Sequence, residues 1–190
     1  MVEKKAFNEI LNKLGYKSFE EIVEEFQHKV YSTVHTFTQN SQDAEDLSQE
    51  VFWQIYQNLT SFKMDSQLST WIYRVTVNKC LSFKRKEARR NSIAGIIPIN
   101  DKVAETVKSS ASVDLDVLNE EKKSILYQAI NNIGQKYAAV ITLKYMQDLS
   151  TKEIGQVLSL PQRTVETQLH RARQKLRSNL ETLGYTMEVN

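Results

Sequence analysis

The chain has 190 residues, of which 41% are hydrophobic and 25% charged, as is usual for a globular protein with one or two cores. With 5 Gly and 2 Pro it has few turn signals for a many-stranded sheet, and its net charge of +2 means that any nucleic-acid surface must come from local clustering. A single cysteine, Cys80, excludes a disulfide within the chain, and because no apolar run reaches about 18 residues we expect no membrane span, no signal peptide and a cytoplasmic location.

The N-terminal part predicts a short leading helix and then a long one. Residues 1–17 carry a brief apolar pattern and are interpreted as an N-terminal extension. Ser18 and Glu21 have the spacing of a capping box, and apolar residues recur behind it at helical intervals. We expect this helix to stop at Asn40 in a left-handed conformation, and Ser41 to cap the following helix.

The next predicted helix, "DAEDLSQEVFWQIYQNL", carries two stripes. Its apolar stripe consists of Leu47, Val51, Ile55 and Leu59. The second stripe is acidic and aromatic, and it consists of Asp46, Glu50, Trp53 and Gln57. Acids also crowd the first turn, where they suit the positive end of the helix dipole. The apolar stripe predicts that this helix packs on a core.

A loop over residues 60–69 leads into a third long helix that begins aromatic and ends strongly basic. Against the one acid Glu87, its second half has six basic residues: Lys79, Lys84, Arg85, Lys86, Arg89 and Arg90. Basic residues interleaved with aromatic rings suit melted or single-stranded nucleic acid, in which bases stack on rings. The alternative is that Trp71 and Tyr73, at the start of the helix, belong to the core.

Helical periodicity is lost between residues 92 and 119, where Gly, Pro, Ser and Asp are scattered. A stretch of this length and composition is typical of a flexible linker. We therefore predict an all-α protein with two small helical domains, a helical bundle at residues 18–91 and a second domain at residues 120–190.

The sequence of the second domain predicts a helix-turn-helix motif. Two apolar-periodic helices separated at Gly134 come first, and Ser150 and Glu153 then form another capping box. A short helix, a turn containing Pro161 and a longer helix follow, which is the order of that motif.

The longer helix, "QRTVETQLHRARQKLR", has one apolar and one polar face. The apolar face consists of Val165, Leu169, Ala172 and Leu176, and the polar face of Arg163, Thr167, His170 and Gln174. In a DNA major groove, Arg163 can read guanine, Gln162 adenine, and Glu166 the cytosine amino group. Basic residues further along are better placed for phosphates: Arg171, Arg173, Lys175 and Arg177. The alternative is a charged face that is merely solvated.

Enzyme chemistry has little support in this sequence. His28 and His35 lie two helical turns apart, too far for a compact metal site without further ligands. The sequence has no HExxH, P-loop, GxSxG or cysteine pair. We therefore expect no catalytic residues, no metal, no cofactor and no small-molecule substrate.

Segments of both predicted domains resemble a known family. "DAEDLSQEVFWQIYQNL" followed by "STWIYRVTVNKCLSFKRK" resembles region 2 of the extracytoplasmic-function (ECF) sigma factors, which are small two-domain initiation subunits of bacterial RNA polymerase. "LSTKEIGQVLSLPQRTVETQLHRARQKLR" resembles region 4 of the same family. The two matches cover residues 18–91 and 120–182, and the unmatched middle is where the family has its linker.

The resemblance implies partners and three binding surfaces. The partners are core RNA polymerase, promoter DNA and an anti-sigma factor, which is often membrane-anchored. Residues implied to dock on the polymerase are Asp46, Gln49, Glu50 and Trp53. Residues implied to act at the −10 element or in melting are Trp71, Arg74, Asn78, Lys79, Lys84, Arg85, Lys86, Arg89 and Arg90, with the loop before them. Residues implied to bind the −35 element are Lys152, Gln162, Arg163, Thr164, Glu166, Thr167, His170, Arg171, Arg173 and Lys175.

Two departures from the family pattern matter. Ile133-Gly134 stands where the family usually has Leu-Pro, and Arg163–Gln168 stands where it often has Gly-Thr-Val-Lys-Ser-Arg. Two typical positive charges thereby become Glu166 and Gln168. We therefore expect this half of the helix to set the promoter choice of this chain apart from that of its relatives.

Two other functions remain open at this stage. A stand-alone helix-turn-helix regulator would explain the C-terminal domain, but such proteins usually dimerise, and this reading leaves residues 42–91 without a role. An all-helical protein-interaction scaffold would fit the apolar content but ignores both basic helices.

Overall fold

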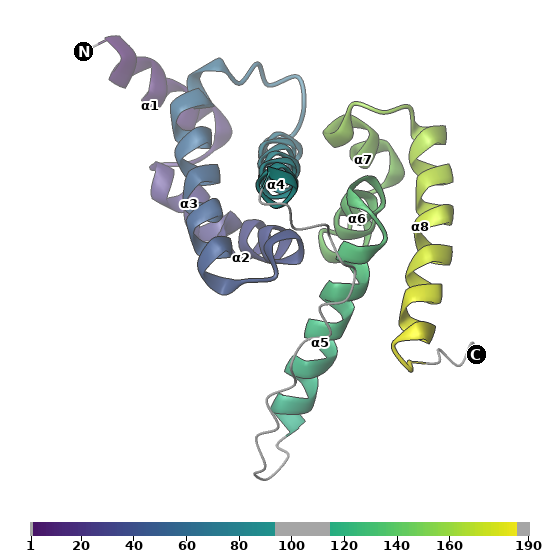
Figure 1. The fold of residues 1–190 in the computed structure, drawn as a ribbon. Coiled ribbons are helices and arrows are strands. Elements are labelled where there is room, and N and C mark those ends of the chain that lie inside the picture. The colour runs from purple at the N-terminus through teal and green to yellow at the C-terminus, as the bar shows by residue number, and fades with distance from the viewer. Residues whose placement is uncertain (1, 94–114, 186–190) are drawn as a thin grey trace.

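The computed structural model describes residues 2–93 and 115–185, and within these ranges the chain is helical and contains no strand (Figure 1). The predicted all-α class is therefore confirmed. In chain order the elements are α1 (Val2–Leu14), α2 (Phe19–Thr38), α3 (Ser41–Asn58), the 3₁₀ turn η1 (Leu59–Ser61), α4 (Leu68–Ile93), α5 (Leu115–Asn132), α6 (Gln135–Ile141), the π-helical turn η2 (Thr142–Met146), α7 (Thr151–Leu158) and α8 (Gln162–Thr182).

The first domain is a bundle of α2, α3 and α4, with α1 packed beside it. The predicted apolar stripe of α3 is buried, since Val51 and Ile55 are fully inaccessible and belong to the same core as Ile22 and Ile72. Burying a side chain of this size stabilises the fold by about 1.5–3 kcal/mol, so the stripe fixes which face of α3 is left outside. Tyr73 is also buried, which confirms the core alternative for that residue.

The junction between α2 and α3 differs by one residue from the sequence prediction. Gln39, not Asn40, takes the left-handed conformation, with a φ of 56°. Asn40, not Ser41, caps α3, because its side chain accepts a 2.9 Å hydrogen bond from the main-chain N–H of Asp43. Asn is found both as the left-handed residue that ends a helix and as the N-cap that begins one. Local sequence alone therefore does not decide which of the two roles Asn40 takes.

At the start of α2 the predicted capping box is incomplete. Ser18 occupies the capping position, but its side chain makes no capping hydrogen bond. The carboxylate of Glu21 instead accepts a 2.7 Å hydrogen bond from the main-chain N–H of Lys17.

The second domain contains the predicted helix-turn-helix in α7 and α8. Its capping box is complete: Ser150 accepts from the main-chain N–H of Glu153, and the Glu153 carboxylate accepts from Ser150. The turn between the helices passes through Ser159, whose φ is 55°. At Gly155 the chain comes so close that an added Cβ would lie 2.7 Å from the main-chain oxygen of Leu160. The tight turn therefore depends on a residue without a side chain at that point.

The two domains contact each other, with α4 lying between α3 and α7 (Figure 1). The main polar contact is made by Gln147, whose Nε2 lies 3.2 Å from the main-chain oxygen of Lys29 and 3.0 Å from the hydroxyl of Thr33. Arg74 on α4 donates to the main-chain oxygen of Gln156 on α7 at 2.7 Å. We call this set of contacts the domain seam.

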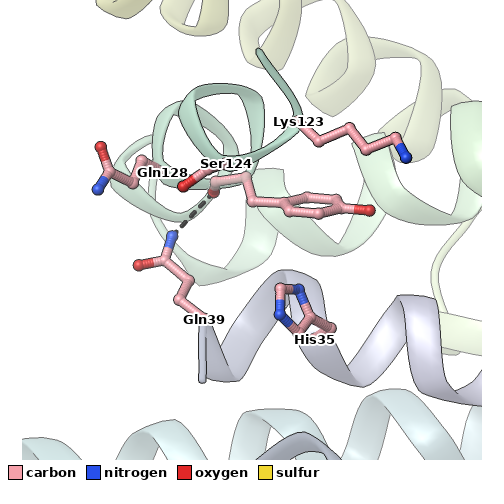
Figure 2. A pocket seen from close by; sticks show the side chains of 6 residues that line it. His35, Gln39, Lys123, Ser124 and Gln128 are labelled. Atoms are coloured by element: carbon pink, nitrogen blue, oxygen red, sulfur yellow. Dashed lines mark hydrogen bonds between the residues drawn. The ribbon is translucent and has the colours of Figure 1, made fainter. Parts of the chain in front are cut away.

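A second part of the domain seam joins α2 to α5 around a cavity of about 160 Å³ (Figure 2). Nε2 of Gln39 donates a 2.9 Å hydrogen bond to the main-chain oxygen of Tyr127 there. The imidazole ring of His35 lies edge-on to the Tyr127 ring, with 5.3 Å between centroids. His35 therefore has an aromatic environment, and it also stacks on Tyr31 at 5.8 Å.

Helices extend into both ends of the predicted linker, since α4 runs to Ile93 and α5 begins at Leu115. The rest of the predicted linker, residues 94–114, lies outside the described residues. Within the ranges that the structure describes, none of the helices is both long and apolar enough to cross a membrane.

Candidate nucleic-acid interface

The burial pattern of α8 decides which of its faces is presented outward. Val165 and Ala172 are inaccessible and Leu169 is 7% exposed, so the predicted apolar face packs on the rest of the domain. The opposite face is open, and Arg163 and His170 are both exposed on it. The orientation that the helical pattern predicted for this helix is therefore confirmed.

Along the first turns of α8, two of the side chains proposed to read bases, Gln162 and Glu166, are paired with each other. Nε2 of Gln162 donates a 3.0 Å hydrogen bond to the Glu166 carboxylate, and the Thr167 hydroxyl donates to the main-chain oxygen of Arg163 at 2.9 Å. Thr164, between Gln162 and Glu166 in the sequence, is half-buried. Gln162 and Glu166 thus form one polar unit, in which the amide partly covers the negative charge.

The second half of α8 offers cations to solvent. Arg171, Arg173 and Lys175 are exposed, and among the described residues none of the three has a carboxylate within ion-pair distance. Arg177 differs, because its Nε donates to Glu181 at 2.9 Å. On α7, Lys152 is exposed as well. Exposed cations that have no carboxylate partner are suited to backbone phosphates.

Sequence analysis missed a second group of residues on this side of the domain. Lys136 and Tyr137 open α6 and line a pocket of about 470 Å³ together with Arg163, Thr167 and Arg171 of α8. Nζ of Lys136 lies 4.8 Å from the centroid of the Tyr137 ring, and Nζ of Lys175 lies 5.8 Å from it. A helical wheel describes one helix at a time, so it could not bring α6 and α8 together.

The environment of Tyr137 shows how positive this pocket is. Desolvation opposes ionisation of its hydroxyl, yet the charges and hydrogen bonds of Lys136 and Arg171 together lower its pKa below the ordinary value. The pocket is therefore a place where negative charge is stabilised.

On α4 the predicted basic cluster is divided between exposed and paired side chains. Exposed members are Arg85, Lys86, Arg89 and Arg90, and the neutral Asn78 on the same helix is exposed as well. Lys84 is paired with Glu87 at 2.8 Å, and Lys79 with Glu50 of α3 at 3.1 Å. Arg74 is half-buried in the domain seam and does not join the exposed group.

Trp71 lies where the loop meets α4, and it is half-buried. Its ring packs at 5.3 Å, centroid to centroid, on the ring of Phe62, which is itself 5% exposed. The loop and the start of α4 are thus held together by an aromatic pair, of which Trp71 is the more exposed member.

The acidic and aromatic stripe of α3 lies on the surface. Asp46, Gln49 and Glu50 are exposed, and Trp53 is 62% exposed. The Trp53 ring stacks on Tyr56 at 6.0 Å with an interplanar angle of 16°. A large aromatic side chain left this open, among acids, is typical of a protein-binding surface.

Comparisons with known proteins match both domains. Residues 22–90 match the family model described as Sigma-70 region 2, and residues 123–176 match the model described as Sigma-70, region 4. The chain is 33% identical over 191 residues to the ECF RNA polymerase sigma factor SigW of Bacillus subtilis, an alignment that covers 96% of this chain and 99% of that one. It is 30% identical over 178 residues to the ECF RNA polymerase sigma-E factor of Escherichia coli K12, covering 92% and 93% of the two chains.

Solved structures share the fold. One is the sigma factor RpoE in complex with the anti-sigma factor NepR from Bartonella quintana, with a TM-score of 0.67 at 21% identity over 87% of this chain and 98% of that one. Another is CnrH in complex with the cytosolic domain of CnrY, with a TM-score of 0.63 at 19% identity over 93% and 98%. The region 2 match also covers residues 42–90, which a stand-alone helix-turn-helix regulator would leave without a role. This chain belongs to the ECF RNA polymerase sigma factors, the promoter-specificity subunits of bacterial RNA polymerase.

Proposed function

We propose that this sigma factor divides promoter recognition between its two domains, residues 18–91 and 120–190. The matched ranges 22–90 and 123–176 lie inside these bounds and support them. The observation that carries the proposal is the outward face of α8, where exposed cations without acidic partners among the described residues lie opposite an apolar face that packs on the domain.

The α7–α8 motif reads the −35 element. Its N-terminal half, from Gln162 to Thr167, faces base edges, while Arg171, Arg173 and Lys175 hold phosphates. His170 lies on the same face, and Lys152 adds a contact from α7. Because Gln162 and Glu166 are hydrogen-bonded to each other, they select bases as a pair.

The −10 element binds along α4 and the loop before it. Asn78 and the surface edge of Trp71 contact unpaired bases, and the basic residues from Lys79 to Arg90 hold phosphates of the melted strand. Opening duplex DNA costs about 1.4 kcal/mol per base-pair step, whereas stacking contributes about 1–3 kcal/mol per base. Stacking on α4 therefore offsets only part of the cost of melting, and contacts with the polymerase must supply the rest.

Core RNA polymerase docks on α3. The exposed Trp53 supplies a large apolar contact, and Asp46, Gln49 and Glu50 surround it with polar groups. Aromatic anchors surrounded by polar residues dominate the energy of many protein interfaces.

An anti-sigma factor, free or membrane-anchored, covers these surfaces until a stimulus releases the chain. The support comes from two proteins of this fold, RpoE and CnrH, whose structures hold an anti-sigma factor and the cytosolic domain of CnrY respectively. The chain acts in the cytoplasm with the polymerase, and it needs neither a cofactor nor catalytic residues of its own.

Reconstituted transcription tests the proposal. Run-off transcription with core RNA polymerase on a library of genomic fragments, followed by mapping of start sites, should yield transcripts that depend on this chain and share two upstream elements. Tight binding to a palindromic operator by the chain alone, with no transcription by the polymerase, would overturn the proposal in favour of a stand-alone regulator.

A further inference from the structure

We infer that Lys136 of α6 binds a backbone phosphate of promoter DNA beside the −35 element, in a pocket that it shares with Arg163 and Arg171. The inference rests on the proposed function and extends the DNA-binding surface to a helix outside the helix-turn-helix. Lys136 lies outside α8 and therefore has no part in the apolar and polar faces predicted for that helix.

The geometry places cations on both sides of one pocket. Lys136 comes from the first turn of α6, whereas Arg163 and Arg171 come from α8 and are eight positions apart, or about 12 Å along a helix axis. Tyr137, 9% exposed, lies between them, with the ammonium group of Lys136 4.8 Å from the centre of its ring. The pocket lining contains no Asp or Glu.

The charge in this pocket is not balanced within the part of the chain that the structure describes. Lys136, Arg171 and Lys175 gather around one tyrosine ring, and no carboxylate there is within ion-pair distance of any of them. Bringing cations together without a counter-charge costs free energy, which a bound anion offsets. Charges and hydrogen bonds of Lys136 and Arg171 outweigh desolvation and lower the pKa of the Tyr137 hydroxyl.

The neighbourhood favours DNA phosphate over a free anion. The first seven residues of α8, Gln162–Gln168, contain one cation, Arg163, and one acid, Glu166, so they have no net charge. Phosphates at the edge of the groove that this half enters must find their positive partners elsewhere. Lys136 lies on a neighbouring helix beside that half and is exposed. Lysine acts on phosphate as a point charge and reads no sequence.

The test uses holoenzyme reconstituted from core RNA polymerase and the full chain, bound to a duplex promoter fragment taken from a mapped start site. Lys136→Met removes the charge and keeps the apolar stem, Lys136→Arg restores a cation, and Lys122→Met removes an exposed lysine from α5 as the matched control. Losing one phosphate contact should lower the slope of log affinity against log salt by about 0.9. Between 50 and 200 mM salt, wild type should therefore lose about 3.5-fold more affinity than Lys136→Met.

A second measurement locates the phosphate. Promoter fragments with a single neutral methylphosphonate at each position around the −35 element should include one that weakens wild-type holoenzyme but leaves Lys136→Met unaffected, with Lys136→Arg behaving like wild type. Equal salt slopes for wild type and Lys136→Met, or identical methylphosphonate profiles, would overturn the inference. Holoenzyme that initiates at the mapped start but shows those results refutes this contact alone, whereas failure of wild type to initiate refutes the proposed function.

Discussion

Nη2 of Arg74 on α4 donates a 2.7 Å hydrogen bond to the main-chain oxygen of Gln156 on α7, which joins the helix proposed for the −10 element to the motif proposed for the −35 element. On a promoter these elements lie about 25 base pairs apart, or about 85 Å at about 3.4 Å per base pair. A compact chain of 190 residues has a radius of gyration of only about 16 Å. The contact between Arg74 and Gln156 and the simultaneous binding that we propose for both elements therefore exclude each other.

The domain seam should open when the chain binds core RNA polymerase. Spin labels attached through Gln27→Cys on α2 and Ser178→Cys on α8 should move apart when polymerase is added, and pulsed electron paramagnetic resonance measures the change. Labels at Gln42 and Asp65, both in the first domain, should keep their separation. An unchanged distance between the domain labels would show that the seam persists in the holoenzyme.

Gln147 gives this prediction a second test without polymerase. Its Nε2 lies within 3.3 Å of three acceptors on α2, and the side chain is buried. Gln147→Ala should weaken the seam by about 1–2 kcal/mol, and the distribution of distances in the free chain should broaden. Tyr145→Ala, at a residue that is 58% exposed nearby, should leave the distribution as in wild type.

Trp53→Ala should weaken binding to core RNA polymerase by about 30-fold, because truncating an aromatic anchor costs about 2 kcal/mol or more. Since the side chain is 62% exposed, the free energy of unfolding should change little. Titration of labelled chain with core polymerase, together with thermal unfolding, separates the two effects. Gln27→Ala, exposed on α2 outside the acidic and aromatic stripe, is the control, and an equal loss there would argue against a specific anchor.

Glu166→Lys should change which promoters are used. The substitution removes the hydrogen bond from Gln162 and places a cation where an acceptor faces the groove. Start-site mapping should reveal a new −35 preference. Gln174→Lys adds one positive charge further along α8, against the change of two in Glu166→Lys, and should raise affinity for all promoters alike. If both variants kept the wild-type promoter profile, Glu166 would have no part in base reading.

Gly155→Ala should destabilise the second domain by about 1–3 kcal/mol, because the new Cβ would lie 2.7 Å from the main-chain oxygen of Leu160 and the turn would have to shift. Hydrogen exchange of the amides in α7 and α8 should speed up, while those of α3 stay protected. Gln156→Ala keeps the main-chain oxygen that Arg74 uses and should exchange like wild type.

Cys80 should be unreactive in the folded protein. Burial raises the pKa of its thiol from 9.0 to about 12, with a smaller opposing effect from a main-chain hydrogen bond, so the reactive thiolate is scarce at pH 8. The unfolded chain loses this proton near pH 9 and the folded chain does not, so this group contributes stability below pH 9 that is lost between pH 9 and about 12. Iodoacetamide should label Cys80 in urea and spare it in buffer at pH 8, where an exposed Ser178→Cys reacts quickly.

Sequence patterns predicted the features that depend on one helix or one turn. The buried stripe of α3, the packed face of α8 and the capping box at Ser150 each follow from residues within a few positions of one another. The exposed position of Trp53 followed in the same way, since it lies beside the apolar stripe. Local spacing is enough for such features because the helix geometry is fixed.

What could not be predicted depends on residues distant in sequence or on near-equal local choices. The left-handed residue and the N-cap are Gln39 and Asn40, one position before the predicted Asn40 and Ser41, and Asn and Ser are both strongly preferred N-caps. The contact between Gln147 and Thr33 spans 114 positions, and the pocket at Lys136 needs α6 and α8 side by side. No periodicity within one helix contains that information.

The ion pair between Glu50 and Lys79, 3.1 Å long, joins a side chain proposed for the polymerase to one proposed for DNA. Polymerase can contact Glu50 only when Lys79 releases it, and DNA can contact Lys79 only when Glu50 releases it. The ligand that binds first therefore frees the residue that the second ligand needs. Such an arrangement gives reciprocal linkage: polymerase favours DNA at α4 to the same degree that DNA favours polymerase at α3. Because the side chains are 30% and 62% exposed, the ion pair contributes at most about 1 kcal/mol, which limits this cooperativity to about fivefold.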